Sequence, residues 1–304
     1  MRLGVIDCGT NTFHLLIASP GEGKAFETHF RERRYVRLGE GGLSTIGQAP
    51  MNRGIECLKH FKEELDRQGV TRVKAFGTET LRQASNGADF IRAVEEETGL
   101  KIQLITGDEE ARLIHLGVMQ AVPPFDGKAL IMDVGGGSVE FIIASESEVF
   151  WAQSFPIGVQ VLFSDFQKND PISQGDMFAL QQHLEDTLQP LRQALQAHQT
   201  PLLLGASGSF EVIEDMLVER KPHPLYSLVP ANDYYNLHSK MLASSLAERL
   251  KMPKLPAERA ELIVVAFVLV DYVIRLAGIR QIIPSVYAMK EGILKEMLEM
   301  RNDD

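Results

Sequence analysis

The sequence predicts an α/β protein with two domains, on the strength of three observations. Strand-like and helix-like patterns alternate along the chain, a linker rich in proline and glycine lies near its middle, and one hairpin pattern occurs twice. A chain of 304 residues is long enough for two domains that each bury a core. Its hydrophobic residues (44%) and charged residues (24%) are those of a soluble globular protein.

The first half of the chain supplies the alternation. Strand-like apolar runs occupy residues 2–7, 13–18, 73–76 and 102–105. Helix-like segments occupy residues 52–69, 89–99 and 108–120. In the first of these, Ile55, Leu58, Phe61 and Leu65 recur at the spacing of one helix face. Such alternation favours helices layered on a sheet.

The stretch AVPPFDG at 121–127 is the predicted domain boundary. The first domain is predicted to comprise residues 1–122 and a last helix, at about 287–304, that crosses back to it. The second domain is predicted to comprise residues 123–286. Its apolar run at 262–270 is too short to span a bilayer, so we expect a buried helix there.

Charge and cysteine content narrow the function classes. A net charge of −10 argues against a broad nucleic-acid-binding surface. Cys8 and Cys57 are the only cysteines, so no disulfide framework is implied and a reducing compartment fits. The N-terminus enters a strand at once and has no secretory leader pattern. We therefore expect a cytoplasmic protein with neither a nucleic-acid nor a membrane partner.

One hairpin pattern occurs twice. Residues 3–18 align with residues 129–144 at an offset of 126, the separation of Asp7 and Asp133. The other matched pairs are Gly9 with Gly135 and Thr12 with Ser138. Both copies read as a strand, Asp-x-Gly, small or hydroxyl residues, and a second strand. The pair predicts a duplicated domain with a cleft between the copies.

These loops suit a phosphate group. Successive N–H groups in a tight glycine turn, such as Gly135, Gly136 and Gly137, can converge on one anion. Glycine is expected there because φ must be positive and no Cβ may block the approach. The hydroxyls of Thr10, Thr12 and Ser138 would add donors. Each loop alone is equally typical of an ordinary hairpin turn, but the matched pair favours the phosphate interpretation.

Carboxylates flank both loops, namely Asp7, Asp133 and Glu140. A carboxylate beside a phosphate is repulsive unless a cation lies between them. These acids therefore imply a hard divalent ion with oxygen ligands, and Mg²⁺ is the expected cofactor.

Two further residues are candidates for catalysis and binding. Thr106 and Glu109 fit a capping box, whereas Glu110 is not needed for the cap and could orient or deprotonate an attacking water. Arg82, in a stretch read as a polar turn at 76–87, could clamp phosphate oxygens. The alternatives, a solvated glutamate in the first turn of a helix and a surface arginine, stay open.

Two segments are ambiguous. Period-2 alternation places Arg31, Arg33 and Arg37 on one strand face, which would either steer a polyanion or protect an edge strand. In LLLGASGSFE, Gly208 opens a helix after a strand. That turn would be either another phosphate contact or only a tight connection.

Seven stretches together resemble one family, the exopolyphosphatases and guanosine pentaphosphate phosphohydrolases of the actin-like superfamily. They are VIDCGTNTFHLLIA, RLGEGG, GTETLRQASNG, ITGDEEARLIHLGV, LIMDVGGGSVEFII, LGASGS and YAMKEGIL, and they occur in the family's order over nearly the whole chain. The resemblance implies two ribonuclease-H-like domains, with mixed sheets flanked by helices and the active site in the interdomain cleft.

By position, the resemblance also implies residue roles. Glu110 is similar to the family's water-activating glutamate, and Asp133 and Glu140 to its metal-linked acids, with Asp7 assisting. The implied phosphate contacts are Thr10, Asn11, Arg82 and the loop Gly135–Ser138. The implied reaction is Mg²⁺-dependent attack of water on the terminal phosphorus of inorganic polyphosphate, releasing orthophosphate, and the same chemistry would convert pppGpp to ppGpp. The family is compatible with a homodimer.

Two other functions are weighed against this one. An ATP-dependent kinase or ATPase of the same superfamily is disfavoured because no adenine-binding segment is recognised, and because Asp108, Glu109 and Glu110 match the phosphatases. A non-catalytic phosphate or alarmone sensor is disfavoured by the retained carboxylates.

Two departures from the family bear on substrate choice. Glu79 stands where a small residue is usual and places a carboxylate near Arg82, which is expected to alter phosphate affinity. Longer family members carry a further C-terminal helical domain, whereas this sequence ends soon after the last predicted helix. Shorter polyphosphate or a nucleotide is therefore favoured over long polyphosphate as the expected substrate.

Overall fold

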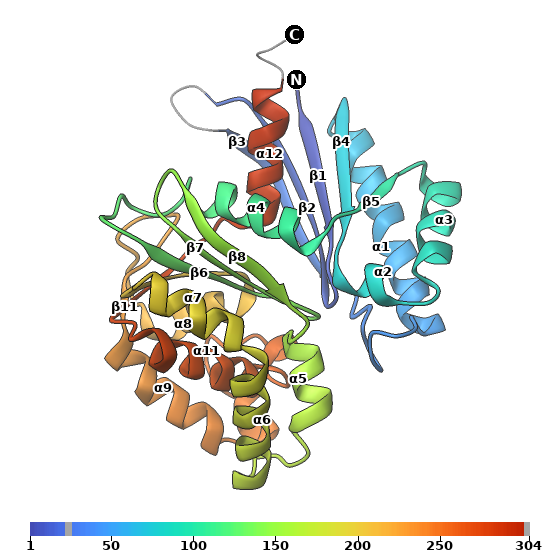
Figure 1. Cartoon of the computed structure of the whole chain (residues 1–304). Coiled ribbons are helices and arrows are strands. Elements are labelled where there is room, and N and C mark those ends of the chain that lie inside the picture. Colours follow the sequence, from blue (N-terminus) through green and yellow to red (C-terminus); the bar gives the residue numbers. More distant parts are fainter. Residues whose placement is uncertain (22–25, 301–304) are drawn as a thin grey trace. The chain divides into compact units, whose positions relative to one another are not determined.

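A computed structural model describes residues 1–21 and 26–300 of the chain (Figure 1). The chain divides into two compact units. Unit 1 runs from Met1 to Gln120 and includes the segment that begins at Met289, and unit 2 runs from Ala121 to Ala288. Residues 301–304, which belong to the last predicted helix, lie outside the described residues.

Unit 1 contains a mixed five-stranded sheet of order β3-β2-β1-β4-β5. Its strands are β1 (Leu3–Cys8), β2 (Thr12–Ser19), β3 (Glu27–Tyr35), β4 (Arg72–Gly77) and β5 (Ile102–Leu104). The first three pair antiparallel, and β4 and β5 extend the sheet in parallel with β1. The alternating strand and helix patterns of this half are therefore confirmed.

The helices of unit 1 cover both faces of that sheet. They are α1 (Gln48–Arg67), α2 (Glu79–Gln83), α3 (Gly87–Thr98), α4 (Gly107–Val118) and α12 (Met289–Glu299). Figure 1 shows α4 and α12 on one face and α1 with α3 on the other. The helices α4 and α12 approach closely, because a Cβ on Gly292 would lie only 1.9 Å from the carbonyl oxygen of Leu113. Buried apolar residues of α1, including Phe61, pack with α3 and the sheet in the core.

Unit 2 contains a six-stranded sheet of order β10-β11-β9-β6-β7-β8. Its strands are β6 (Ala129–Val134), β7 (Val139–Ala144), β8 (Val149–Phe155), β9 (Leu202–Ala206), β10 (Val229–Pro230) and β11 (Gln281–Pro284). Strands β6, β7 and β8 pair antiparallel, whereas β9 and β11 are parallel neighbours of β6 and β9 respectively.

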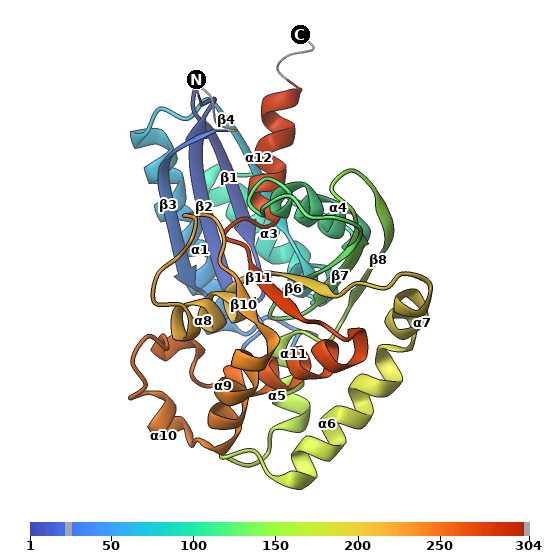
Figure 2. The same ribbon diagram turned by 90° about the vertical axis from the view of Figure 1, so that its left-hand side faces the viewer.

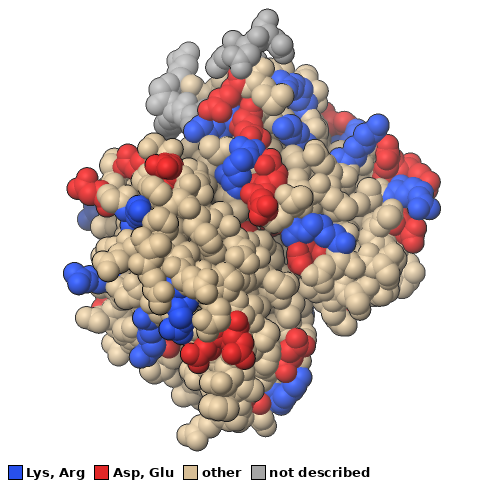
Figure 3. All heavy atoms as spheres, viewed as in Figure 1, with Lys and Arg blue, Asp and Glu red and all other residues tan. Residues whose placement is uncertain are grey.

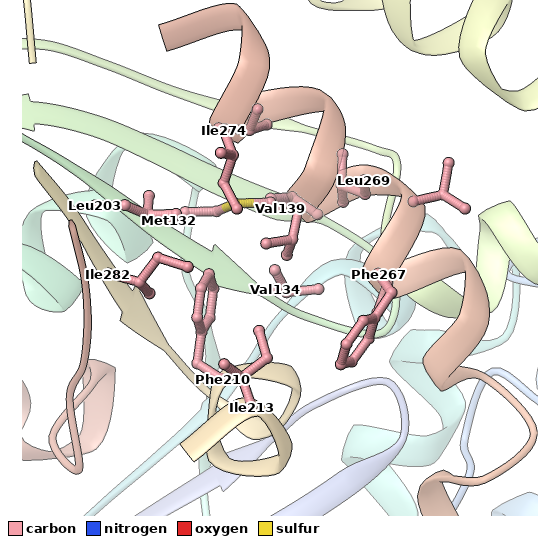
Figure 4. Packing of buried hydrophobic residues seen from close by; sticks show 14 of the residues in the cluster. Met132, Val134, Val139, Leu203, Phe210, Ile213, Phe267, Leu269, Ile274 and Ile282 are labelled. Carbon is pink, nitrogen blue, oxygen red and sulfur yellow. The ribbon is translucent and has the colours of Figure 1, made fainter. Parts of the chain in front are cut away.

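The helices of unit 2 pack around α11 (Ile263–Ala277), which is the predicted buried helix. The others are α5 (Val159–Phe166), α6 (Gln174–Thr187), α7 (Gln189–Ala197), α8 (Gly208–Leu217), α9 (Ala231–Ala243), α10 (Leu246–Arg249) and the 3₁₀ turn Ala257–Arg259. Figure 2 shows α6, α7, α9 and α11 from the side. Figure 4 shows Met132, Val139, Phe210 and Phe267 meeting in the core between this sheet, α8 and α11.

The two sheets repeat one plan. The order β3-β2-β1-β4-β5 matches β8-β7-β6-β9-β11 strand for strand. The register matches as well, because Asp7 pairs with His14 and Asp133 pairs with Glu140. The predicted α/β class, with two mixed sheets, is confirmed. The repeated sequence pattern corresponds to a repeated pattern of strand pairing.

Two local predictions were wrong. The stretch read as a polar turn at 76–87 contains the short helix α2, whose last turn carries Arg82. Arg37 does not share the face of Arg31 and Arg33, because β3 ends at Tyr35 and Arg37 has a φ of +51°. The turn that follows β3 breaks the period-2 alternation.

Within the described residues, no helix is long and apolar enough to cross a bilayer. Acidic and basic side chains adjoin one another over the part of unit 1 where α4 and α12 lie (Figure 3). There Arg112 pairs with Glu109 at 2.8 Å and also with Glu296. The Arg112–Glu296 pair therefore joins α4 and α12.

Candidate functional site

The loop between β1 and β2 is tied down through its carbonyl groups. The turn closes on itself, with the N–H of Gly9 donating to the Thr12 carbonyl at 3.1 Å. The Asn11 carbonyl accepts from the N–H of Arg37 at 2.9 Å, and the Thr10 carbonyl accepts from the N–H of Gly39 at 3.1 Å. The segment after β3 therefore fixes this loop from the side that its carbonyls face.

The loop between β6 and β7 is tied down in the same way. The N–H of Gly135 donates to the Ser138 carbonyl at 3.0 Å. The Gly137 carbonyl accepts from Gly158 at 3.1 Å, and the Gly136 carbonyl accepts from Gln160 at 2.8 Å. Here the donors are Gly158, which is the N-cap residue of α5, and Gln160 in its first turn, whose N–H groups have no partner within the helix.

The two loops thus share one hydrogen-bond scheme at equivalent positions. In each, the two central carbonyls accept from N–H groups that lie two residues apart in the segment following the third strand. In the described part of the chain, no hydrogen bond uses the backbone N–H of Gly136 or of Gly137. Because the loop carbonyls are already hydrogen-bonded, the N–H groups of Gly136 and Gly137 can donate to another acceptor. An anion-binding nest requires such donors.

The physical reason predicted for the glycines was wrong. None of Gly9, Gly135, Gly136 and Gly137 has a positive φ. Close approach explains two of them instead, because a Cβ on Gly135 would lie 2.8 Å from the Ser138 carbonyl oxygen, and one on Gly9 would lie 3.0 Å from that of Thr12. The tight turn excludes a side chain at its first position, even though the backbone there is not left-handed.

Asp133 and Glu140 lie side by side in unit 2. They are direct cross-strand partners on β6 and β7, so both project from the sheet face opposite Met132 and Val134. Both are buried, at 6% and 2% exposure. Ser154, the next residue in the same row on β8, donates its hydroxyl to Glu140 Oε1 at 2.7 Å. Two buried carboxylates directly opposite each other repel, which favours a cation beside them.

This donor set fits Mg²⁺. Magnesium is usually held by one or two carboxylates with waters and substrate phosphates, and unit 2 supplies two carboxylates beside the loop that ends at Ser138. The described residues contain no cluster of three or more histidine, cysteine or acidic residues suited to a metal. Metal binding by Asp7, Asp133 and Glu140 therefore stays a prediction.

The corresponding row in unit 1 has a different charge pattern. Asp7 pairs with His14, and His14 pairs with Arg33 on β3. Nε2 of His14 also lies 3.1 Å from the hydroxyl of Thr12. Where unit 2 places two carboxylates and a hydroxyl, unit 1 places an acid, an imidazole and a cation. Of the two copies, unit 2 has the more metal-like set of ligands.

Thr10 and Asn11 are held differently within the first loop. Thr10 is buried and its hydroxyl accepts from that of Thr80 at 2.8 Å, which links the loop to α2. Asn11 has a buried side-chain oxygen that makes no hydrogen bond with the described residues. Thr10 therefore positions α2 beside the loop.

Arg82 and Glu110 are brought together by α2 and α4. Nη1 of Arg82 donates to Glu110 Oε2 at 3.0 Å and to the Ile105 carbonyl at 2.7 Å. Nε of Arg82 donates to Glu79 Oε2 at 3.1 Å, and its Nη2 contacts the same oxygen. Burial lowers the pKa of Arg82, but the attraction of Glu110 and Glu79 outweighs it, so this pKa is raised overall.

Glu110 is a buried residue in the first turn of α4, at 7% exposure, rather than a solvated one. The helix is capped as predicted, because the Thr106 hydroxyl accepts from the N–H of Glu109 at 3.2 Å. The Glu109 carboxylate binds Arg112 instead of completing a capping box. Glu110 is thus free of a capping role and is oriented by Arg82.

Gly208 reveals a residue that the sequence analysis missed. Asp133 pairs with Ala206, so the turn Ser207–Gly208 begins at the same sheet edge as the glycine loop. A Cβ on Gly208 would lie 1.2 Å from Nη1 of Arg259, and Ser207 has a φ of +67°. Arg259 also binds Glu211 at 2.9 Å. Only the folded chain places this guanidinium over the first residue of α8, because it lies 51 residues further along the sequence.

The predicted site residues are divided between the two units. The unit 1 group comprises Asp7, Thr10, Asn11, Thr12, Arg82 and Glu110, and the unit 2 group comprises Asp133, Gly135, Gly136, Gly137, Ser138, Glu140 and Gly208. In each unit, the glycine loop and the turn after the neighbouring parallel strand begin at one sheet edge.

Comparisons with known proteins agree with this architecture. Residues 16–301 match the model of the Ppx/GppA phosphatase family. An exopolyphosphatase from Cytophaga hutchinsonii is 37% identical, with a TM-score of 0.94 and coverage of 98% of each chain. The Ppx-GppA enzyme of Aquifex aeolicus is 25% identical, with a TM-score of 0.80 and coverage of 97% of this chain and 99% of that one. These likenesses confirm the predicted fold class, the two-domain actin-like fold with mixed sheets flanked by helices.

Proposed function

Because the chain belongs to the Ppx/GppA phosphatase family, we propose that it is a phosphoanhydride hydrolase that removes the terminal phosphate of inorganic polyphosphate. The observation that carries this proposal is the hydrogen-bond pattern that the two glycine loops share. The carbonyls of the first loop accept from the N–H groups of Arg37 and Gly39. Those of the second loop accept from the N–H groups of Gly158 and Gln160. The likeness to an exopolyphosphatase of 37% identity supports the same substrate class.

In the proposed reaction, water attacks the terminal phosphorus while the bond from that phosphorus to the bridging oxygen breaks. The products are orthophosphate and a chain one phosphate shorter. Glu110 orients the water and accepts its proton, because its carboxylate is buried at a helix start and held by Arg82. Glu110 acts by positioning the water more than by base strength, because phosphoryl transfer depends mainly on positioning.

The other predicted site residues are assigned to binding the substrate and the metal ion. Phosphate contacts are assigned in unit 2 to the backbone N–H groups of Gly136 and Gly137 and to the hydroxyl of Ser138, and in unit 1 to the guanidinium of Arg82. Asp133 and Glu140 would hold Mg²⁺, with Asp7 as a further candidate ligand. When bound, the ion supplies positive charge between these acids and the phosphates, as phosphoryl transfer generally requires.

The same chemistry would remove the terminal phosphate of pppGpp, since only the 5′ triphosphate end of that molecule reacts. The residues described above contact phosphate groups and therefore do not distinguish the two substrates.

The proposal is tested by measuring orthophosphate release from short polyphosphate, long polyphosphate and pppGpp, with Mg²⁺ and with a chelator. We expect release from at least short polyphosphate, dependent on Mg²⁺. Absence of release from all three, or transfer of phosphate from ATP to acetate or a sugar, would overturn it. The ratio of the three rates assigns the preferred substrate.

A further inference from the structure

The guanidinium of Arg82 is already engaged on both sides by groups of its own chain. Its five N–H donors form a planar fork. Nη1 is taken by Glu110 and the Ile105 carbonyl, at 3.0 and 2.7 Å. Nε and Nη2 are both taken by one oxygen of Glu79. An anion that approaches Arg82 therefore meets a cation whose partners must first rearrange.

Glu79 occupies the edge of Arg82 that suits a phosphate. The Nε–H and one Nη–H of an arginine point in parallel, and bidentate binding of a carboxylate or phosphate uses that pair. Glu110 and Ile105 bind at the other terminal nitrogen and leave this edge alone. Within this cluster, Glu79 is thus the group in direct competition for the edge.

The Glu79–Arg82 ion pair is strong enough to compete with a phosphate for the Arg82 guanidinium. The two side chains are only 12% and 20% exposed, so water screens their attraction less than it would at the surface. Glu79 lies three residues before Arg82 on α2, and its second oxygen accepts from Gln83. The carboxylate is therefore held in place by residues of its own helix.

We propose that Glu79 is an internal competitor for the Arg82 guanidinium, which weakens the binding of orthophosphate and makes the site selective for longer, more highly charged phosphate chains. The inference rests on the proposed function in one respect, that Arg82 contacts phosphate. Orthophosphate must displace a carboxylate with little more charge than the carboxylate carries. A polyphosphate end can stay bound through its other phosphates while Glu79 remains on Arg82, so Glu79 lowers its affinity less. Glu79 thereby favours release of the product over release of the substrate.

The test is calorimetric titration of orthophosphate and of tripolyphosphate into the wild-type protein, Glu79→Gln and Glu79→Ala, without added metal. We expect both variants to bind orthophosphate about three- to tenfold more tightly, the factor for loss of one partly exposed ion-pair competitor. Tripolyphosphate affinity should rise less. Asp89→Asn is the matched control, because Asp89 pairs with Arg92 at the same helical spacing and at 3.1 Å. This control should leave both affinities unchanged.

A double-mutant cycle isolates the route of the effect. In an Arg82→Gln background, Glu79→Gln should no longer tighten orthophosphate binding, because the contested guanidinium is gone. Weaker or unchanged orthophosphate binding in both Glu79 variants would overturn the inference, as would a gain that persists without Arg82. Thermal unfolding of each variant checks that α2 stays folded.

The titrations test the inference about Glu79, and the turnover assay tests the proposed reaction, so either can be wrong without the other. If the wild-type protein releases orthophosphate from polyphosphate while the Glu79 variants bind orthophosphate as it does, only the inference about Glu79 is wrong. If no substrate is hydrolysed yet the variants bind orthophosphate more tightly through Arg82, the inference stands and the proposed reaction is wrong.

Discussion

Nη1 of Arg82 lies 3.0 Å from Oε2 of Glu110. The residue proposed to orient water and the residue proposed to hold phosphate are thus joined in one ion pair between α2 and α4. The pair holds the Glu110 carboxylate beside the cation that a substrate would engage.

Glu110→Gln should lower orthophosphate release from polyphosphate by about 10²- to 10⁴-fold, the usual effect of removing a general base. Anion binding should be kept, because the amide removes a negative charge near the phosphates. Release rates and calorimetric titration with tripolyphosphate check the two halves of this prediction. Glu109→Gln is the control, since Glu109 binds Arg112 on the exposed side of the same turn. Full activity of Glu110→Gln would remove the residue from its proposed role.

Ser154→Ala should raise the Mg²⁺ concentration that gives half-maximal activity by about tenfold, with a smaller effect at saturating Mg²⁺. The Ser154 hydroxyl donates to Glu140 at 2.7 Å, and groups that orient a metal ligand typically contribute this much to metal affinity. A Mg²⁺ titration of phosphate release measures the change. Gln153→Ala is the control, because the preceding residue of β8 projects from the opposite face. Equal Mg²⁺ dependence in wild type and Ser154→Ala would contradict the assigned role.

Gly158→Ala should both destabilise unit 2 and abolish phosphate release. A Cβ there would lie 2.3 Å from the carbonyl carbon and oxygen of Gly136, so the glycine loop must shift. Overpacking against backbone costs about 1–3 kcal/mol or more, measurable as a lower melting temperature. Gly175→Ala near the start of α6 is the control, where the nearest atom to a Cβ is 3.8 Å away. That variant should be neutral or slightly stabilised.

Lowering the pH from 7.5 to 5 should destabilise the chain partly through His238. Burial lowers the pKa of His238 between α9 and α11, while Asp271 raises this pKa and Arg275 lowers it. Since the unfolded chain binds the proton more readily than the folded one, this stability is present above pH about 6.5 and is lost as the pH falls through the folded value. Melting temperatures of wild type and His238→Gln across this range test the prediction. Equal slopes for the two proteins would count against it.

The sequence predicted the features that depend on local pattern. Helical spacing at Ile55, Leu58 and Phe61 predicted the buried face of a helix, and the apolar run at 13–18 predicted a strand. The structure confirms both elements. The echo at Asp7 and Asp133 predicted two equivalent hairpins, because the two copies keep the same order of strand, turn and hydroxyl residues.

Only the tertiary structure decided which groups are available to a ligand. The carbonyls of Gly136 and Gly137 are bound by α5, Arg82 is held by Glu79 and Glu110, and Arg259 covers Gly208. The expected positive φ in the glycine loop gave way to close backbone packing. Most of these contacts join residues far apart in the chain, and even the near pair Glu79–Arg82 needed the helix α2, which the sequence read as a turn. Local periodicity therefore identifies the elements, whereas hydrogen bonds and ion pairs between elements determine which donors a phosphate could reach.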